Sequence, residues 1–288
     1  MARRNIFELL REKDSSSFSD NIRRIRNLYS GEYDFARDIN GKDYTLEEFV
    51  DEFAFNTWKA RGRCIDQDDF YETIDFSSIQ LGSQYSLEDF LSEIEVIYNF
   101  WYIAVKYIKE YSYAFQCLDT ADELKKLMDA CLSDFNHKAF YDENSEQLII
   151  AEDKPEITAV AEIVEPQAAF EIIRYNHRTL QGDVEAKKRI LLTMGAALEP
   201  QREDLKTINR ALESGIFFML NNLNLRHNNR TEGDKNYKKA VASMPAEDLE
   251  HWYDELYQMI LLANLELDNK SRMHDISNLK SALSEGAS

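Results

Sequence analysis

Glycine and proline are scarce in this chain of 288 residues, with nine and four copies respectively. Folds that need many tight turns, such as Rossmann domains, barrels and sandwiches, use these two residues freely. The shortage disfavours those folds and favours helices joined by short polar loops. Hydrophobic residues make up 44% and aromatic residues 12% of the chain, so we expect a sizeable buried core and no disorder of the whole chain.

Cysteine is also rare, and no hydrophobic run is long. Cys64, Cys117 and Cys131 include no C-x-x-C pair, and their odd number argues against a disulfide framework. Cys117 and Cys131 fall within helical patterns, where we expect small buried side chains. No apolar run follows residues 1–4, and the most apolar stretch, 96–105, is too short to cross a bilayer. We therefore expect a cytoplasmic protein with no signal peptide and no contact with a membrane.

Sequence motifs that mark a metal or a cofactor are missing. The chain contains no glycine-rich phosphate loop, no G-x-S-x-G, no H-E-x-x-H and no cysteine–histidine spacing for zinc. Residues 66–69 resemble the start of a calcium loop, but the fifth position is Phe70 and the sixth is not glycine. These motifs therefore identify no metal site and no phosphate-binding loop in the sequence.

Negative charge is concentrated in the first part of the chain. Residues 1–165 carry 35 acidic and 18 basic side chains, a net charge of −17, whereas residues 166–288 carry 18 and 16, a net charge of −2. The acidic part repels nucleic acids and anionic membranes at long range. It serves solubility, or it binds a basic surface on another protein. The nearly neutral part can approach a phosphate without a large electrostatic penalty.

Apolar residues recur at steps of three and four along most of the chain, which predicts helices. In the first half the expected helices cover about 20–29, 46–60, 87–115 and 120–135. The last three follow capping-box patterns that begin at Thr45, Ser86 and Thr120. In the second half the expected helices cover 168–180, 184–198, 201–225, 246–267 and 276–283. Gly215 lies inside one of them, which predicts close contact with another helix.

The pattern changes near residue 138. Two short apolar runs, 139–141 and 147–151, flank five polar residues, and this arrangement is typical of a β-hairpin. Pro155 and Pro166 then bound a short helix. Because the charge also changes here, we expect an acidic helical region over 1–150, a linker with a short helix over 151–165, and a second helical region over 166–288. The predicted fold is all-α, a helical bundle with one small β-hairpin near the middle of the chain.

Side chains that can bind an anion or transfer a proton are most concentrated in residues 220–230, LNNLNLRHNNR. This segment lies at the predicted end of a long helix and before a polar loop. Two interpretations are open. Arg226 and His227 can cap the helix, since its last carbonyls attract cations, with Asn228 and Asn229 in left-handed turn conformations. Alternatively, His227 acts as a general acid/base while Arg226 or Arg230 holds a phosphate, which is the pair that RNA cleavage needs.

A long amphipathic helix, this cluster, a polar loop and another long helix resemble the HEPN superfamily over residues 166–285. That superfamily supplies ribonucleases to toxin–antitoxin and abortive-infection systems. Its usual motif is an arginine, often followed by asparagine, and a histidine four to six residues after the arginine. His227 matches the histidine and Asn222 the polar residue, but Asn221 stands where the arginine is expected, and the nearest arginine, Arg226, adjoins the histidine. Residues 221–229 also resemble stretches in uncharacterised bacterial proteins associated with phage defence.

The resemblance implies a metal-independent endoribonuclease-like effector of bacterial phage defence, of the abortive-infection type, that acts on RNA as a homodimer without a cofactor. His227 would be the acid/base and Arg226 the phosphate ligand. The residues that would orient the RNA are Asn222, Asn228, Asn229 and Arg230. Candidate anchors for the dimer interface are Phe217, Phe218 and Trp252.

A second hypothesis is non-catalytic. In this case the acidic N-terminal half binds a basic protein, so that the chain works as an antitoxin-like partner or as a mimic of nucleic-acid charge. The displaced arginine favours this second hypothesis, whereas the density of asparagine, arginine and histidine favours the first.

Overall fold

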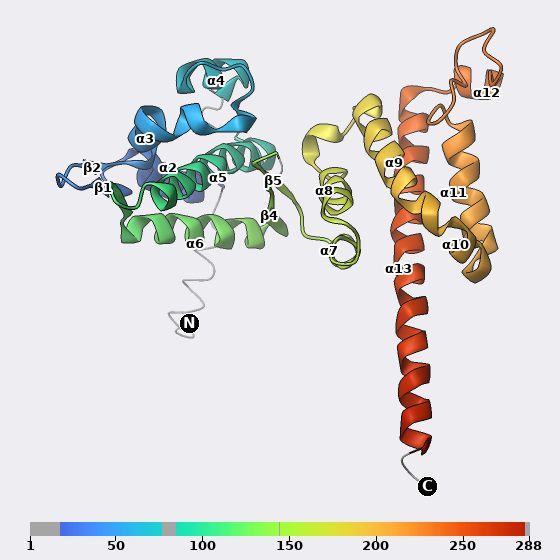
Figure 1. Cartoon of the computed structure of the whole chain (residues 1–288). Coiled ribbons are helices and arrows are strands. Elements are labelled where there is room, and N and C mark those ends of the chain that lie inside the picture. Colours follow the sequence, from blue (N-terminus) through green and yellow to red (C-terminus); the bar gives the residue numbers. More distant parts are fainter. Residues whose placement is uncertain (1–17, 77–84, 144, 286–288) are drawn as a thin grey trace, which may run out of the picture. The chain divides into compact units, whose positions relative to one another are not determined.

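The computed structural model describes residues 18–76, 85–143 and 145–285 (Figure 1). The chain divides into two compact units, Met1–Glu152 and Asp153–Ser288. The division falls within the stretch where the charge and the sequence pattern change. Both units are mainly helical, as expected, but the described residues form two small antiparallel sheets and not the single hairpin that the sequence predicted.

Unit 1 is a set of helices with two small sheets. Its helices are α2 (Phe18–Ser30), α3 (Leu46–Phe49), α4 (Gln67–Thr73), α5 (Leu87–Glu110) and α6 (Asp119–Asp134). The unexpected sheet has the order β2-β1-β3 and consists of β1 (Ala36–Asp38), β2 (Asp43–Tyr44) and β3 (Phe115–Cys117). The predicted hairpin is confirmed as β4 (His137–Asp142) and β5 (Gln147–Glu152), with Ala139 opposite Ile150.

The capping boxes at Thr45 and Ser86 are confirmed. The one predicted at Thr120 is wrong, because α6 begins at Asp119 behind Leu118, which has no side-chain cap. The backbone N–H of Leu118 donates to the carbonyl of Phe35 (2.9 Å), and this pairing between distant segments fixes where the helix begins.

Two other helix predictions in unit 1 fail at their C-terminal ends. The helix expected over 46–60 is α-helical only in α3 and continues as a π-helical turn (Val50–Ala54) and a 3-10 turn (Phe55–Thr57). Trp58 then adopts an extended conformation, before a second 3-10 turn (Lys59–Arg61). This conformation lets the Trp58 indole N–H donate to the carbonyl of Glu146 (3.0 Å). The helix expected to reach residue 115 ends at Glu110, and Cys117 lies in β3 and is exposed, whereas Cys131 is buried as expected.

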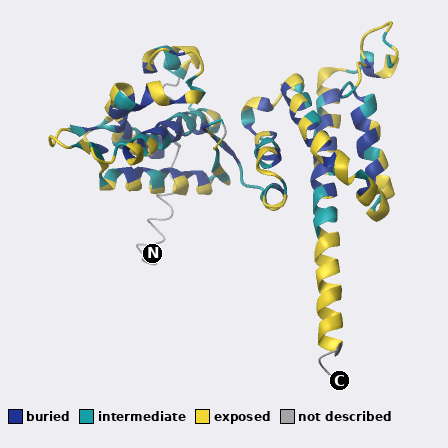
Figure 2. Ribbon diagram, in the orientation of Figure 1, coloured by how far each residue is buried: buried dark blue, intermediate teal, exposed yellow. Residues whose placement is uncertain are grey.

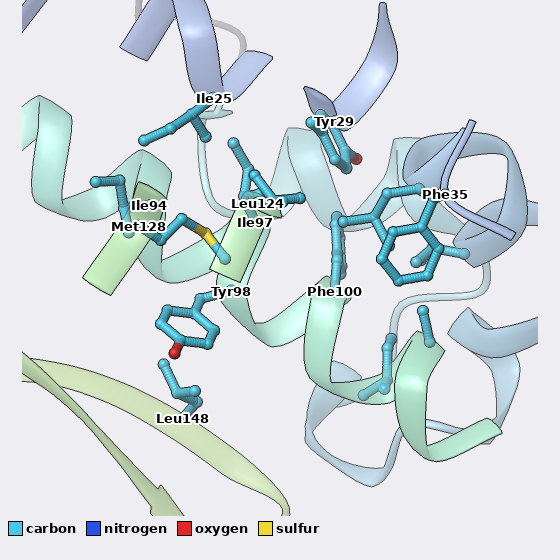
Figure 3. Close-up of a cluster of buried hydrophobic side chains, with 14 of the residues drawn as sticks. Ile25, Tyr29, Phe35, Ile94, Ile97, Tyr98, Phe100, Leu124, Met128 and Leu148 are labelled. Carbon is cyan, nitrogen blue, oxygen red and sulfur yellow. The ribbon is translucent and has the colours of Figure 1, made fainter. Parts of the chain in front are cut away.

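The core of unit 1 lies between α2, α5, α6 and the hairpin (Figure 3). Ile25 from α2, Ile97 and Phe100 from α5, and Leu124 from α6 are each at most 1% exposed. Leu148 of β5 is 5% exposed and belongs to the same cluster. The apolar stripe of α5 therefore packs against other elements all along its length, as its width in the sequence predicted.

One polar side chain in this core attaches the hairpin to α5. The Asn99 amide donates to the carbonyl of Leu148 (2.8 Å) and accepts from the Leu148 N–H (2.9 Å), and it is 8% exposed. Glu95, one turn earlier, accepts from the N–H of Ile150 (2.7 Å). These side chains satisfy the edge of β5 that faces away from β4, so the two-stranded hairpin needs no third strand.

The turn of the hairpin is held by charge. Glu146 has the left-handed φ of 55°, which a residue with a side chain adopts only where other contacts hold it. Its Oε1 is 2.8 Å from Nζ of both Lys59 and Lys106, and these hydrogen bonds lower the pKa of Glu146. With the Trp58 bond, they fix the turn against α5, which carries Lys106, and against the second 3-10 turn, which begins at Lys59.

Unit 2 consists of helices and loops, with no strand among its described residues. Its helices are α7 (Pro155–Ala161), α8 (Pro166–Arg174), α9 (Val184–Leu198), α10 (Arg202–Ile208), α11 (Arg210–Asn222), α12 (Lys239–Ala242) and α13 (Ala246–Glu285). Proline occupies the first position of α7 and α8, where its missing N–H costs nothing. The first half of α13 packs against α7, α9, α10 and α11. Its side chains Tyr253, Leu256 and Tyr257 are at most 1% exposed.

The helix expected over 201–225 is wrong, because Asn209 leaves the helical conformation (φ −145°, ψ 86°) and separates α10 from α11. Its side chain accepts from the N–H of Leu212 (3.0 Å) and donates to Glu266 of α13 (3.1 Å). The separate helices expected over 246–267 and 276–283 are one continuous helix, α13. The close contact at Gly215 is confirmed, since a Cβ there would lie 2.7 Å from the terminal methyl of Met259. Among the described helices, none combines the length and the apolar content that a bilayer span requires.

The Asn99 amide gives a direct test of how the hairpin is held. Asn99→Leu leaves the N–H and the carbonyl of Leu148 buried without partners, at a cost of about 1–3 kcal/mol each. We expect the free energy of unfolding of unit 1 to fall by about 2–5 kcal/mol in thermal or urea unfolding followed by circular dichroism. The control Asn27→Leu changes an exposed asparagine of α2 and should shift stability by less than about 0.5 kcal/mol. Equal effects of the two substitutions would show that the Asn99 bonds do not hold the hairpin.

Candidate functional site

Residues 223–230, in which the sequence predicted most of the site, form the turn after α11. The chain leaves the helix at Leu223 and reverses at Asn224, which has a left-handed φ of 58°. The sequence placed left-handed residues at Asn228 and Asn229; this is wrong, because neither has a positive φ. Near the end of α11, the carbonyl of Leu220 accepts a hydrogen bond from the N–H of Arg226 (2.9 Å). The carbonyl of Leu223 accepts one from the hydroxyl of Tyr253 (3.0 Å).

The asparagines of this segment support its own backbone. Asn229 is fully buried, and its side chain accepts from the N–H of Asn224 (2.8 Å) and donates to the carbonyl of Asn236 (2.8 Å). Asn228 accepts from the N–H of Thr231 (3.1 Å) and donates to its hydroxyl (2.8 Å). Asn222 donates to the carbonyl of Phe218, one turn back in α11 (2.7 Å). The amides predicted to orient RNA thus build the loop in this structure.

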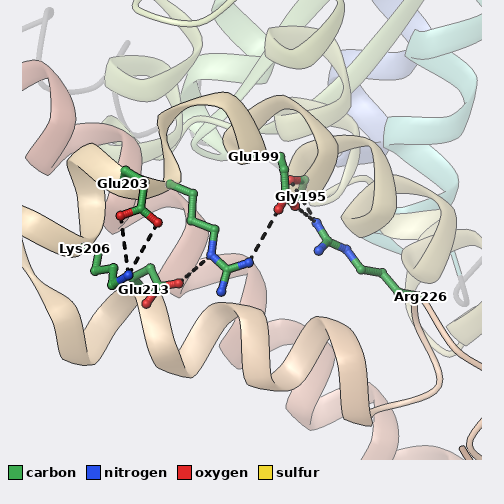
Figure 4. Close-up of polar contacts among 7 residues, drawn as sticks. Gly195, Glu199, Glu203, Lys206, Glu213 and Arg226 are labelled. Carbon is green, nitrogen blue, oxygen red and sulfur yellow. Dashed lines mark hydrogen bonds and ion pairs between the residues drawn. The ribbon is translucent and has the colours of Figure 1, made fainter.

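Arg226 is part of an ion-pair network across unit 2 (Figure 4). Its Nη2 contacts Oε2 of Glu199, just after α9, and lies 3.5 Å from the carbonyl of Gly195. Arg202 lies 3.6 Å from the other oxygen of Glu199 and 2.6 Å from Glu213. Arg226 therefore pairs with a carboxylate near the end of α9 and does not cap α11.

Both guanidinium groups of the network lie over one aromatic ring. The guanidinium carbons of Arg202 and Arg226 are 4.1 Å and 5.3 Å from the centre of the Phe217 ring. Phe217 itself is 2% exposed, so this side chain belongs to the core and is not available as an interface anchor. Phe218 and Trp252, the other two candidate anchors, are 62% and 44% exposed.

His227 and Arg230 lie on the exposed side of the loop. The His227 side chain makes no hydrogen bond or ion pair with any described residue. Arg230 is exposed, and its Nη2 donates to the carbonyl of Met244 (3.1 Å). The structure therefore directs the Arg226 side chain to Glu199 and leaves the neighbouring His227 in solvent.

A polar cavity of about 590 Å³ lies elsewhere in unit 2, at the N-terminal ends of α9 and α13. Its lining combines basic, acidic, amide and phenol side chains, among them His177, Arg178, Lys187, His251 and Asp254. No sequence pattern predicted that these residues lie together. The only signal available was Glu250 and Asp254 at helical spacing on α13, because the other residues are separated by tens of positions.

Lys187 carries a buried charge in the wall of this cavity. Its side chain is 8% exposed, and its Nζ lies 2.7 Å from Oε1 of Glu250 and 2.7 Å from Oδ1 of Asp254. Tyr175 donates to the same oxygen of Asp254 (2.9 Å), and its ring stacks on Tyr257 at 4.2 Å. Burial, followed by the Asp254 carboxylate, raises the pKa of Tyr175, so the phenol stays protonated. The charges of this wall are mutually compensated, which suits a structural role.

Unit 1 contributes a different kind of surface. We define the acidic face as Glu47, Glu48, Asp51, Asp68 and Glu72, carried by α3, α4 and the turn after α3. Burial, and then the charges of Glu48, Asp51 and Asp68, raise the pKa of Glu47. Because a like charge disfavours ionisation only at short range, Glu47 lies close to Glu48, Asp51 and Asp68, and Glu72 is one helical turn from Asp68 on α4.

The carboxylates of the acidic face lack cationic partners in the part of the chain that the structure describes. None of its five carboxylates forms an ion pair with a described residue. Ile65 and Ile74, at the two ends of α4, are 72% and 42% exposed. Negative charge and exposed apolar side chains thus occur together on this part of unit 1.

No family model, curated protein or solved structure matches this chain. The HEPN resemblance therefore rests on the residues of the 166–285 region alone. Within the described part of the chain, no group of histidine, cysteine, aspartate and glutamate side chains is arranged to hold a metal ion.

The Lys187 cluster should make the stability of unit 2 depend on pH. Burial acts to raise the pKa of Glu250, but hydrogen bonds from Lys187 and from the Gly182 N–H outweigh it, and the pKa lies below the ordinary 4.5. A lowered pKa contributes stability that is complete above the unfolded value and is lost as the pH falls through the folded value. We expect Glu250→Gln to destabilise unit 2 by about 1 kcal/mol at pH 7 and by much less near pH 3.

Urea unfolding followed by Trp252 fluorescence in a Trp58→Phe/Trp101→Phe background measures this effect, because Trp252 is then the only tryptophan of the chain. Glu255→Gln, at an exposed position of the same helix, is the matched control and should change stability by less than about 0.5 kcal/mol at either pH. If Glu250→Gln lowered the free energy of unfolding equally at pH 3 and pH 7, the lowered pKa of Glu250 would not be the source of the stability.

Proposed function

We propose that this protein acts by binding, and that the acidic face of unit 1 docks on a basic, partly apolar surface of another protein. The observation that carries the proposal is the gathering of five carboxylates, none of which pairs with a cation among the described residues. Like charges at helical spacing, such as Glu47 with Asp51 and Asp68 with Glu72, cost about 0.2–0.5 kcal/mol a pair. A basic partner would relieve this repulsion.

The net charge and the exposed isoleucines support the same proposal. The charge of −17 on residues 1–165 would steer a basic partner toward this part of the chain and would raise the association rate at low salt. Ile65 and Ile74 would then supply apolar contact beside the charges. An antitoxin-like partner and a protein that mimics nucleic-acid charge would both use such a surface. Under this proposal the partner is a cytoplasmic protein.

A charge-neutralised variant tests the acidic face. The variant Asp51→Asn/Asp68→Asn/Glu72→Gln removes three charges from it, and Asp122→Asn/Glu123→Gln/Asp134→Asn removes three exposed charges from α6. The probe is a fluorescent amphipathic peptide of lysine and leucine, titrated at low and high salt. We expect the first variant to bind about tenfold more weakly, a change of about 1.4 kcal/mol, and the second to bind less than about twofold more weakly.

Binding by the unchanged protein should weaken at high salt, because exposed charges are screened. Because the first variant removes repulsion, it should be at least as stable to heat as the unchanged protein, which separates lost binding from lost folding. Equal losses of affinity in the two variants would show that the net charge, and not the acidic face, attracts the peptide.

A second candidate function is metal-independent RNA cleavage by unit 2, as an endoribonuclease-like effector of phage defence that acts as a homodimer. The exposed, unengaged His227 beside Arg226 favours it. In this mechanism His227 would move the proton of the 2′-hydroxyl or of the leaving group, and Arg226 would exchange Glu199 for a phosphate. Arg230 would contact the sugar–phosphate backbone of the same RNA. No metal or cofactor takes part in these steps.

Incubation of the purified protein with total RNA, with and without a chelator, tests this function. We expect cleavage that survives the chelator and falls ~10²–10⁴-fold in His227→Ala, because a general acid/base is lost. Arg226→Lys should retain part of the activity, since it keeps the charge but loses the bidentate fork. His274→Ala changes an exposed histidine of α13 and should leave cleavage unchanged. Intact RNA with the unchanged protein, or equal activity in His227→Ala, would rule this function out.

A further inference from the structure

The second half of α13 projects from unit 2 with its side chains in solvent. The helix has 40 residues, about 60 Å at 1.5 Å per residue. Every residue over 269–284 is exposed, as the lower half of α13 shows in Figure 2. Lys270 still pairs with Asp204 of α10 (2.9 Å). Helices as short as the remaining segment are marginal in water unless a face of them packs on something.

Apolar side chains follow one face of this projecting segment. Ile276, Leu279 and Leu283 are 42%, 58% and 67% exposed, and they are spaced by three and four residues. The face continues backward along the helix to Leu262, which is 47% exposed. Counting in sevens from Leu262 as an a position, the a and d positions are occupied by Leu262, Leu265, Asn269, Arg272, Ile276, Leu279 and Leu283.

Three of the residues at these positions favour a two-stranded parallel coiled coil, beside leucines at the a positions 262 and 283. Isoleucine at a (Ile276) with leucine at d (Leu279) favours two strands over three or four. A single asparagine at an a position (Asn269) fixes the register and the number of strands at some cost in stability. Arg272 interrupts the d positions, and its guanidinium pairs with Asp268 of the same helix. Its aliphatic stem can cover the apolar face while the charge stays in water.

The flanking charges match the same arrangement. Asp275 occupies a g position and Lys280 the following e position. In a parallel coiled coil a g residue faces the e residue five positions later on the other helix, so Asp275 and Lys280 of two copies would form two equivalent ion pairs. Neither side chain forms an ion pair with the described residues of its own chain.

We propose that a second copy of this chain covers this face, and that the two copies of α13 form a parallel coiled coil over residues 262–283. Heptad spacing, the asparagine at an a position and the complementary charges all identify a second copy as the occupant. The proposal uses neither the acidic face nor the loop after α11, so it does not rest on either function proposed above, although the RNA-cleavage candidate also calls for a homodimer.

Light scattering and analytical ultracentrifugation of the full chain test the coiled coil. We expect the unchanged protein to form a dimer of two 33.7-kDa chains at micromolar concentration. Ile276→Glu/Leu279→Glu should raise the dissociation constant at least ~100-fold, because it puts four carboxylates into the apolar interface. The control His274→Glu/Ser281→Glu adds the same charge at outward positions of the same helix and should remain a dimer.

A charge reversal tests the parallel register. Lys280→Glu should weaken the dimer, and Asp275→Lys/Lys280→Glu should restore it, because the two ion pairs are then rebuilt in the opposite sense. Failure of the double variant to recover would overturn the parallel register. If the unchanged protein stayed monomeric at 100 µM, the proposal would be overturned, and the apolar face of α13 would have to bind a different protein. A dimer that survives Ile276→Glu/Leu279→Glu would place the interface elsewhere.

Discussion

The Asn99 amide is the contact on which the organisation of unit 1 depends. It pairs with the N–H and carbonyl of Leu148 in the interior of unit 1, where a missing partner would leave two buried polar groups unsatisfied. Through this contact α5 supplies what a third strand would give the hairpin. The turn at Glu146 is then within reach of Lys59 and Lys106, and the hairpin ends at Glu152, where unit 1 ends. The position of one amide on α5 thus sets the position of the last element of the unit.

Sequence patterns predicted those parts of the fold that depend on neighbouring residues. Apolar spacing and local caps placed α2, α9 and most of α5, and Gly215 marked a close helix contact, since these signals lie within a few turns. The failures arise where a distant segment decides. Leu118 begins α6 because its N–H pairs with Phe35, and Trp58 leaves the helix to reach Glu146. Asn209 looks like any polar residue of a helix, yet its bond to Glu266 separates α10 from α11.

The same distinction applies to the candidate sites. The sequence identified a dense cluster around Arg226, but the partner of Arg226 is Glu199, 27 positions earlier, and no local pattern indicates this pairing. The polar cavity joins His177, Lys187 and Asp254, which only the packing of α9 against α13 brings together. The sequence predicted an excess of negative charge over 1–165. It did not predict the acidic face, because the sequence does not show which of these carboxylates lie next to one another in the fold.

The unbroken course of α13 has a mechanical consequence. Its first turns carry Glu250 and Asp254, which hold Lys187 in the wall of the polar cavity, and its last turns carry Ile276 and Leu279. About 35 Å of helix separates these two regions, at 1.5 Å per residue, and no glycine or proline interrupts it. With no hinge residue between them, both regions belong to one stiff helix, so the exposed end cannot bend independently of the turns that line the cavity.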